Sequence, residues 1–135
     1  MTFDPNVDYP LGSRRPDLIE TPSGLALDDV TLEAARAGTL VAADIRATSA
    51  TLRRQAEVAR VSGRRPLADN LDRAAELAGV PDDQLLEIYT ALRPGRSTAT
   101  ELETWARRLE DWEAPLTAAF VREAASAYVE RGLVS

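Results

Sequence analysis

Hydrophobic residues recur at three- and four-residue spacing from residue 28 onward, a pattern that predicts a succession of amphipathic helices. Capping residues, glycine or proline bound each stretch, and Thr98 to Glu101 has the capping-box form Thr-x-x-Glu. No segment alternates between apolar and polar residues as a half-buried strand would. The predicted helices cover residues 28–37, 48–62, 65–78, 81–92, 98–112 and 115–131.

The predicted apolar faces differ in the size of their side chains. The helices at 48–62 and 65–78 carry stripes rich in alanine, which fit either close packing in a bundle or a protein interface. We expect the face of the fifth helix to consist of Leu102, Trp105, Leu109 and Trp112. We expect the face of the sixth to consist of Leu116, Phe120, Ala124 and Tyr128, widened by Val121, Ala125 and Val129.

The first 27 residues follow no helical period and contain four of the eight prolines. Because proline lacks an amide donor and restricts the residue before it, we expect an extended arm that packs on its own or a partner's surface. The sequence therefore predicts an all-α fold in a single domain. It consists of an irregular Pro-rich N-terminal arm over residues 1–27 and an open up-and-down helical bundle of about five to six helices over residues 28–135.

Three absences from the composition exclude most catalytic chemistry. The chain has no cysteine and no histidine, and all 16 of its basic residues are arginine. Thiolate nucleophiles, histidine bases, cysteine and histidine metal ligands and lysine Schiff bases are therefore excluded. We accordingly predict no catalytic residue, no cofactor-binding residue and no metal ligand in this chain. The exclusive use of arginine fits an interface-forming protein, but codon bias explains it equally well.

Charge and hydropathy narrow the possible partners. The net charge of −6 argues against nucleic acid, and no apolar run approaches the roughly 20 residues of a membrane-spanning helix. The N-terminus has no secretory-signal pattern, so we expect a cytoplasmic protein. The residues thus indicate an acidic helical protein that binds another protein.

A long segment from Val80 to Thr98 carries a family resemblance. It reads V-P-D-D-Q-L-L-E-I-Y-T-A-L-R-P-G-R-S-T, and it is similar to the small (γ) subunit of adenosylcobalamin-dependent diol dehydratases and glycerol dehydratases. Shorter segments agree in the same order along nearly the whole chain. They include D-Y-P-L at 8–11, L-D-D-V-T-L-E at 27–33, T-L-R-x-Q-A at 51–56 and Y-V-E-R at 128–131.

The resemblance implies a function within an assembly of three different subunits, each present twice. In that family the large subunit holds the substrate and a metal ion, and adenosylcobalamin lies between the large and medium subunits. A radical reaction converts a vicinal diol to an aldehyde, and the cofactor performs the difficult chemistry. The small subunit docks on the large subunit and supplies no catalytic residue. Whether glycerol or propane-1,2-diol is preferred stays open.

The sequence departs from the family pattern near both ends. Family members linked to bacterial microcompartments carry a longer extension before D-Y-P-L, whereas seven residues precede Asp8 here, so we do not expect microcompartment association. The basic C-terminal tail that is common in the family is also missing.

Six residues within the matched segments are our candidates for partner binding, because aromatic and arginine side chains often anchor interfaces. They are Tyr9, Pro10, Leu11, Tyr89, Arg93 and Arg96. In the alternative interpretation, Tyr89 is a core residue and Arg93 caps a helix end. A free-standing helical adaptor or regulator is the rival function, and an independent enzyme is less favoured for want of catalytic side chains.

Overall fold

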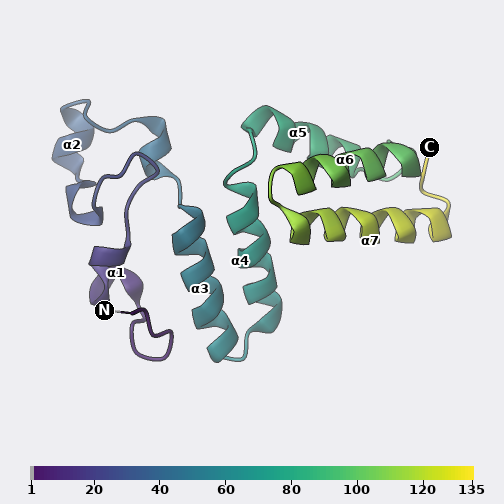
Figure 1. Cartoon of the computed structure of the whole chain (residues 1–135). Coiled ribbons are helices and arrows are strands. Elements are labelled where there is room, and N and C mark those ends of the chain that lie inside the picture. The colour runs from purple at the N-terminus through teal and green to yellow at the C-terminus, as the bar shows by residue number, and fades with distance from the viewer. Residues whose placement is uncertain (1) are drawn as a thin grey trace. The chain divides into compact units, whose positions relative to one another are not determined.

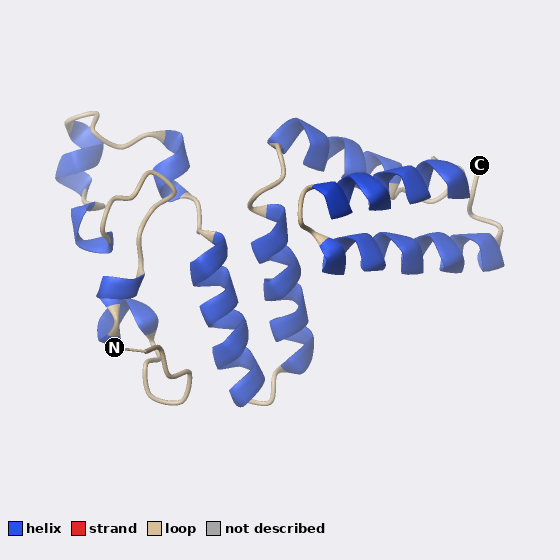
Figure 2. Ribbon diagram, in the orientation of Figure 1, coloured by secondary structure: helices blue, strands red, loops and turns tan. Residues whose placement is uncertain are grey.

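The computed structural model describes residues 2–135 and confirms the all-α prediction. Figure 2 shows helices and loops only, and the described residues form no strand beyond an isolated bridge between Glu20 and Ala26. The chain divides into two compact units, residues 1–75 and 76–135, which we call the N-terminal and C-terminal units. Their boundary lies within a helix, far from the end of the expected arm at residue 27.

The N-terminal unit contains short helices followed by two long ones (Figure 1). Its one-turn and 3-10 elements are α1 (Leu11–Arg14), η1 (Pro16–Leu18), η2 (Leu27–Asp29), α2 (Leu32–Arg36) and η3 (Ala42–Ile45). The long helices are α3 (Ser49–Val61) and α4 (Arg65–Leu77), both close to their predicted bounds. The Thr48 hydroxyl caps α3 by accepting a hydrogen bond from the Thr51 amide at 3.2 Å.

The expectation of an extended arm is wrong for residues 11–18, which form α1 and η1. Proline does not prevent this structure, because Pro10 lies before the first turn and Pro16 lies at the first position of η1. The first amides of a helix have no intrahelical acceptors, so a proline at that position removes no intrahelical hydrogen bond. The Pro10 carbonyl accepts the Arg14 amide at 2.9 Å and closes the α1 turn.

The predicted helix at 28–37 is confirmed only over Leu32–Arg36, which form α2, and its predicted start is wrong. Asp28 and Asp29 end the 3-10 turn η2, and α2 starts only at Leu32. The Thr31 hydroxyl caps α2, accepting the Ala34 amide at 3.1 Å. This local cap starts the helix three residues later than the aspartates would.

The core of the N-terminal unit lies between α3 and α4 and is built from alanine. Ala56, Ala59 and Ala68 are buried, and Leu71 packs against them. Such small side chains let two helices approach closely, as the alanine stripes predicted. An ion pair between Arg60 and Asp72 joins the same two helices at the surface.

The C-terminal unit contains three helices around a larger apolar core. They are α5 (Asp82–Ala91), α6 (Ala99–Asp111) and α7 (Pro115–Arg131). Pro81 occupies the position before α5 and not its first turn, a one-residue correction. The predicted capping box is confirmed, because Thr98 and Glu101 each accept the other's amide, at 3.1 and 2.8 Å. The buried core residues are Val80, Ile88, Leu102, Ala106, Leu109, Ala114, Ala118 and Val121.

The predicted apolar face of α7 is partly wrong. Leu116 and Phe120 are 52% and 46% exposed, while Thr117, Ala118 and Val121 are buried. The prediction followed the larger side chains Leu116 and Phe120, although Glu123, Ser126 and Glu130 mark an exposed polar side opposite the buried residues. The small residues Ala114, Ala118 and Val121 face the core because they permit close packing with Leu102 and Leu109 of α6.

A buried carboxylate caps the start of α7. Glu76, which is 8% exposed, accepts the amides of Leu116 and Thr117 at 2.9 and 2.8 Å and the Thr117 hydroxyl at 2.8 Å. The negative charge lies at the positive end of the helix dipole, where it stabilises α7. Pro115 leaves this helix start without one amide, and Glu76 satisfies the next two.

Candidate docking surfaces

Within residues 2–135 there is no group of three or more acidic side chains placed to hold a metal ion. None of the helices described is both long and apolar enough to cross a membrane. The buried carboxylates Asp44 and Glu76 are both engaged in hydrogen bonds that fix the fold.

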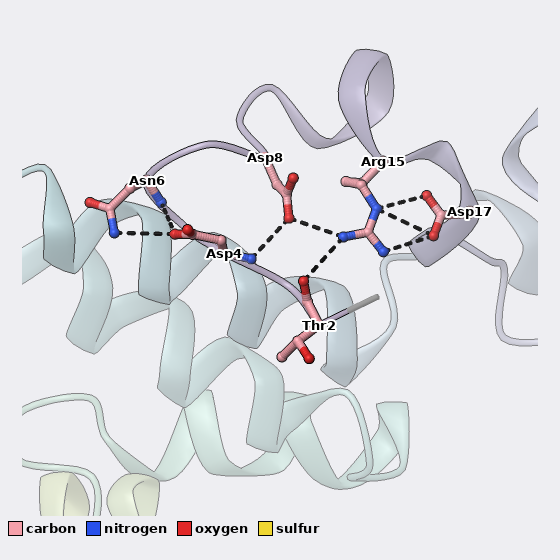
Figure 3. Close-up of polar contacts among 6 residues, drawn as sticks. All are labelled: Thr2, Asp4, Asn6, Asp8, Arg15 and Asp17. Carbon is pink, nitrogen blue, oxygen red and sulfur yellow. Dashed lines mark hydrogen bonds and ion pairs between the residues drawn. The ribbon is translucent and has the colours of Figure 1, made fainter.

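In the arm, Thr2, Asp8 and Asp17 surround Arg15, and we call this polar cluster the clasp (Figure 3). The Arg15 guanidinium donates to Asp8 Oδ2 at 3.0 Å, to both oxygens of Asp17, and to the Thr2 carbonyl at 3.5 Å. The hydrogen bond from Arg15 lowers the pKa of Asp17, and the Asp17 and Asp8 carboxylates raise the pKa of Arg15. The Asp8 carboxylate also accepts the Asp4 amide at 2.9 Å. The clasp therefore fixes the backbone just before Tyr9.

Tyr9, Pro10 and Leu11 follow the clasp but face different surroundings. The Tyr9 ring is 55% exposed and Pro10 is exposed, whereas Leu11 is 1% exposed. Leu11 therefore supports the arm from within and offers no side-chain surface. Tyr9 lies at the edge of an open groove of about 300 Å³ between the arm and the α3–α4 hairpin, which we call the arm groove. The rest of its lining is Gln55, Val58, Ala59, Ser62, Arg64, Leu67 and Leu71.

A second polar centre in the N-terminal unit holds the loop before α3. The buried Asp44 carboxylate accepts the Thr21 and Ser23 hydroxyls and the Val41 amide. These bonds, that from Ser23 above all, lower the pKa of Asp44 despite burial, which acts in the opposite direction. The next residue, Ile45, is left 82% exposed. Sequence reasoning missed this centre, because nothing in the spacing of the chain brings residues 21 and 44 together.

Tyr89, Arg93 and Arg96 lie at the end of α5 in the C-terminal unit. Tyr89 is 60% exposed, so the alternative of a core tyrosine is wrong. Arg93 follows the C-cap residue Leu92, and its guanidinium donates no hydrogen bond to another described residue. Both arginines are exposed. All three side chains therefore face outward.

Arg96 also lines an open concavity of about 420 Å³ between α5 and α6, which we call the α5–α6 concavity. It is acidic as well as apolar, and its other lining residues are Leu86, Glu87, Thr90, Ala91, Ser97, Glu101 and Trp105. Leu86 is 68% exposed and was missed by sequence reasoning, although its place between Leu85 and Ile88 put it beside the predicted apolar face.

The C-terminal residues brace the loop that carries Arg96. The Gly95 amide donates to the Leu133 carbonyl at 2.6 Å, and the Ser135 amide donates to the Ser97 carbonyl at 3.0 Å. The Tyr128 hydroxyl donates to the Leu92 carbonyl at 2.6 Å. The loop between α5 and α6 is thus fixed from α7 and the segment after it.

The structure therefore contains two exposed surfaces with interface-type residues, one in each compact unit. Tyr9 and Pro10 belong to the N-terminal unit, and Tyr89, Arg93 and Arg96 belong to the C-terminal unit. We describe each surface by itself. Arg64 and Leu67 of the arm groove were not among the six predicted residues, because their exposure depends on how α3 and α4 pair.

Comparisons with known proteins place this architecture in a family. A family model described as the dehydratase small subunit matches residues 5–135. The propanediol dehydratase small subunit of Citrobacter freundii is 53% identical over 125 residues, which cover 92% of this chain and 73% of that protein. The propanediol dehydratase small subunit of Salmonella typhimurium strain LT2 is 52% identical over 125 residues, covering 92% of this chain and 72% of that protein.

Proposed function

Because the chain belongs to the dehydratase small-subunit family, we propose that it is the non-catalytic small subunit of a propanediol dehydratase. The observation that carries the proposal is the 53% identity to a propanediol dehydratase small subunit over 92% of the chain. The reaction would be the dehydration of a vicinal diol to an aldehyde through radical intermediates. The choice between propane-1,2-diol and glycerol would belong to the large subunit.

The composition and the surfaces of the chain support a role in assembly. The chain lacks histidine, cysteine and lysine, so it cannot supply the usual catalytic side chains. It does expose tyrosine and arginine side chains, which are common anchors of protein interfaces. Its partners in this proposal are the large and medium subunits, in a doubled heterotrimer located in the cytoplasm.

Adenosylcobalamin, which supplies the radical chemistry in such a complex, would be held by the larger subunits. The residues of this chain do not fit that cofactor. It has no histidine to bind cobalt, and the arm groove and the α5–α6 concavity, of about 300 and 420 Å³, are open surface hollows that do not enclose a ligand. We therefore assign no step of the reaction to residues of this chain.

Docking in this proposal uses both exposed surfaces. Tyr9 and Pro10 would contact a partner from the N-terminal unit, with Leu11 supporting them from below. Tyr89, Arg93 and Arg96 would contact a partner from the C-terminal unit, where exposed Leu86 adds apolar area. Burial of such aromatic and apolar groups drives association, and arginine adds hydrogen bonds of defined direction.

Co-expression with the large and medium subunits tests the proposal. The full-length chain, tagged at its N-terminus, is purified by affinity and then by size exclusion. Elution of all three subunits together at the mass of a doubled heterotrimer is expected. Elution of a folded chain by itself would overturn the proposal in favour of an adaptor or regulator.

A double variant tests the surface at the end of α5. Tyr89→Ala with Arg93→Ala should weaken co-purification, because both side chains are exposed and neither supports the core. Arg107→Ala with Thr104→Ala, exposed on α6, provides the matched control. Full recovery of the complex with the Tyr89 and Arg93 variant, folded normally by circular dichroism, would remove these residues from the interface.

A further inference from the structure

The arm groove combines an apolar floor with an arginine that no carboxylate of the described chain neutralises. We propose that it receives a segment of the large dehydratase subunit that presents an apolar side chain next to a carboxylate. This inference rests on the proposed function and specifies the chemistry of the partner at one surface.

The floor of the arm groove is apolar and comes from both long helices. Val58 and Ala59 of α3 are 8% and 5% exposed, and Leu71 of α4 is partly buried against the alanine core. Leu67 is 44% exposed and Tyr9 is 55% exposed, so each retains apolar surface that water now contacts. An apolar side chain of a partner would remove this surface from water, which is the main driving force of association.

The rim of the groove carries polar groups that lack partners in the described chain. Among the described residues the Arg64 guanidinium has no ion-pair or hydrogen-bond partner, whereas Arg60 is paired with Asp72. The Gln55 amide and the Tyr9 hydroxyl likewise have no hydrogen-bond partner among the described residues. In a chain of net charge −6, an unpaired arginine beside an apolar floor favours a carboxylate from outside.

The groove is held in shape before any partner arrives. The Arg64 amide donates to the Ala59 carbonyl at 2.8 Å, which fixes the turn between α3 and α4. On the other side, the bond from Arg15 to Asp8 fixes the residue before Tyr9. A surface that is already ordered loses less conformational entropy on binding, so it binds more tightly for the same contacts.

The size of the groove favours side chains over a separate ligand. About 300 Å³ lies at the lower limit of small-molecule pockets, which span about 300–1,000 Å³ and enclose most of their ligand. The arm groove is open along one side, as expected for a surface that receives part of another chain. Tyrosine and arginine at its edge are the residue types in which binding energy concentrates.

Binding measurements with charge reversal test the inference. The full-length chain is immobilised, and the purified complex of large and medium subunits is passed over it by biolayer interferometry. Arg64→Glu should raise Kd by at least about tenfold, since it places a carboxylate opposite the partner's own, and Tyr9→Ala should raise it by a comparable factor. Arg53→Glu, an equal charge change at an exposed α3 position outside the groove lining, should leave Kd within about twofold.

The possible outcomes separate this inference from the proposed function. If the wild-type chain binds and Arg64→Glu binds equally well, the groove assignment is wrong while the subunit function stands. If the wild-type chain does not bind at all, both are overturned. Should Tyr9→Ala fail to fold, Leu67→Ser at an exposed groove position replaces it, and unchanged binding of that variant counts against the groove.

A second copy of this chain is the other occupant that the test can reveal. The chain alone is examined by size exclusion with light scattering, as wild type and as Arg64→Glu. A wild-type monomer agrees with the inference. A dimer that Arg64→Glu dissociates would overturn the inference and assign the groove to self-association.

Discussion

The two compact units reach a folded state by different means. The C-terminal unit packs Leu102, Leu109 and Val121 into one apolar core, whereas the core of the N-terminal unit is largely alanine. The N-terminal unit relies in addition on polar centres at Arg15 and Asp44. Its ten arginines nearly balance eleven carboxylates, while the C-terminal unit has six arginines for eleven. The two units thus differ mainly in the side chains that fill their cores, which are alanine in one and leucine, isoleucine and valine in the other, while each unit also contains a buried polar centre.

This comparison can be tested because the chain places its two tryptophans, Trp105 and Trp112, in the C-terminal unit. Tryptophan fluorescence therefore reports on that unit, and far-UV circular dichroism reports on the helices of both. The variants that follow use these two signals during urea unfolding.

The largest loss of stability is expected from Leu109→Ala. Leu109 is fully buried in the C-terminal core, and truncating such a leucine removes apolar contact and leaves a cavity. The free energy of unfolding measured by fluorescence should fall by about 2–5 kcal/mol. Leu86→Ala, at a side chain 68% exposed, is the control and should change it by less than about 0.5 kcal/mol. Equal effects of the two variants would contradict the assignment of the core.

Overpacking should be the sensitive change in the N-terminal unit. Ala68 is fully buried between α3 and α4, so Ala68→Leu forces the helices apart. We expect a loss of about 1–3 kcal/mol by circular dichroism. Ala50→Leu adds the same side chain at an exposed α3 position and should be nearly neutral. A stabilising effect of Ala68→Leu would show that the alanine core contains unfilled space.

Removal of the α7 cap should have a smaller effect. Glu76→Ala leaves the amides of Leu116 and Thr117 without their acceptor. A loss of about 0.5–2 kcal/mol is expected, typical of a lost N-cap, with fluorescence as the measurement. Glu87→Ala, exposed on α5, is the matched control. If both variants unfold at the same urea concentration, the Glu76 contacts do not stabilise α7.

The smallest expected effect is the contribution of Asp44 to the pH dependence of folding stability. Its pKa is lowered in the folded chain, so its ionised form stabilises the fold above its unfolded pKa of about 3.9. This contribution declines as pH falls below that value and is lost below the folded pKa. Asp44→Asn should therefore lose less stability than wild type as pH falls from 5 to about 3 by circular dichroism. Parallel pH curves for the two proteins would show that Asp44 carries no such linkage.

Other carboxylates should not obscure that difference. The hydrogen bonds from Arg122 lower the pKa of both Glu103 and Glu110, so these groups also favour the fold above acidic pH. Asp44→Asn leaves them unchanged. Their effect is common to both proteins and cancels in the comparison.

The sequence correctly predicted the helix ends that are determined by residues adjacent in the chain. The starts of α3 and α6 follow from Thr48 and Thr98, and the end of α7 follows from Gly132, whose φ of 67° is favourable for glycine. The helix expected at 28–37 begins later than predicted because Thr31 caps α2, which starts at Leu32. The predicted face of α7 was partly wrong because the prediction followed the large side chains Leu116 and Phe120 and not the polar side that Glu123 and Glu130 mark.

The sequence indicated which types of residue are exposed on the candidate surfaces, but it did not indicate where the arm groove lies. Tyr9, Tyr89 and Arg96 are exposed, whereas Leu11 is buried. The arm groove depends on the pairing of α3 with α4 and on the bond from Arg15 to Asp8. These contacts join residues far apart in sequence, which spacing alone does not reveal.

The short turn between α3 and α4 makes the chain's arginines useful as protease sites. Trypsin cleaves after arginine but poorly before proline, so the bond between Arg65 and Pro66 is protected by its own sequence, while the bond after Arg64 is a trypsin site that local opening of the first turn of α4 would expose. That bond borders the arm groove. A partner seated there would shield it, and the rate of a single cut would then report how much of the subunit is assembled.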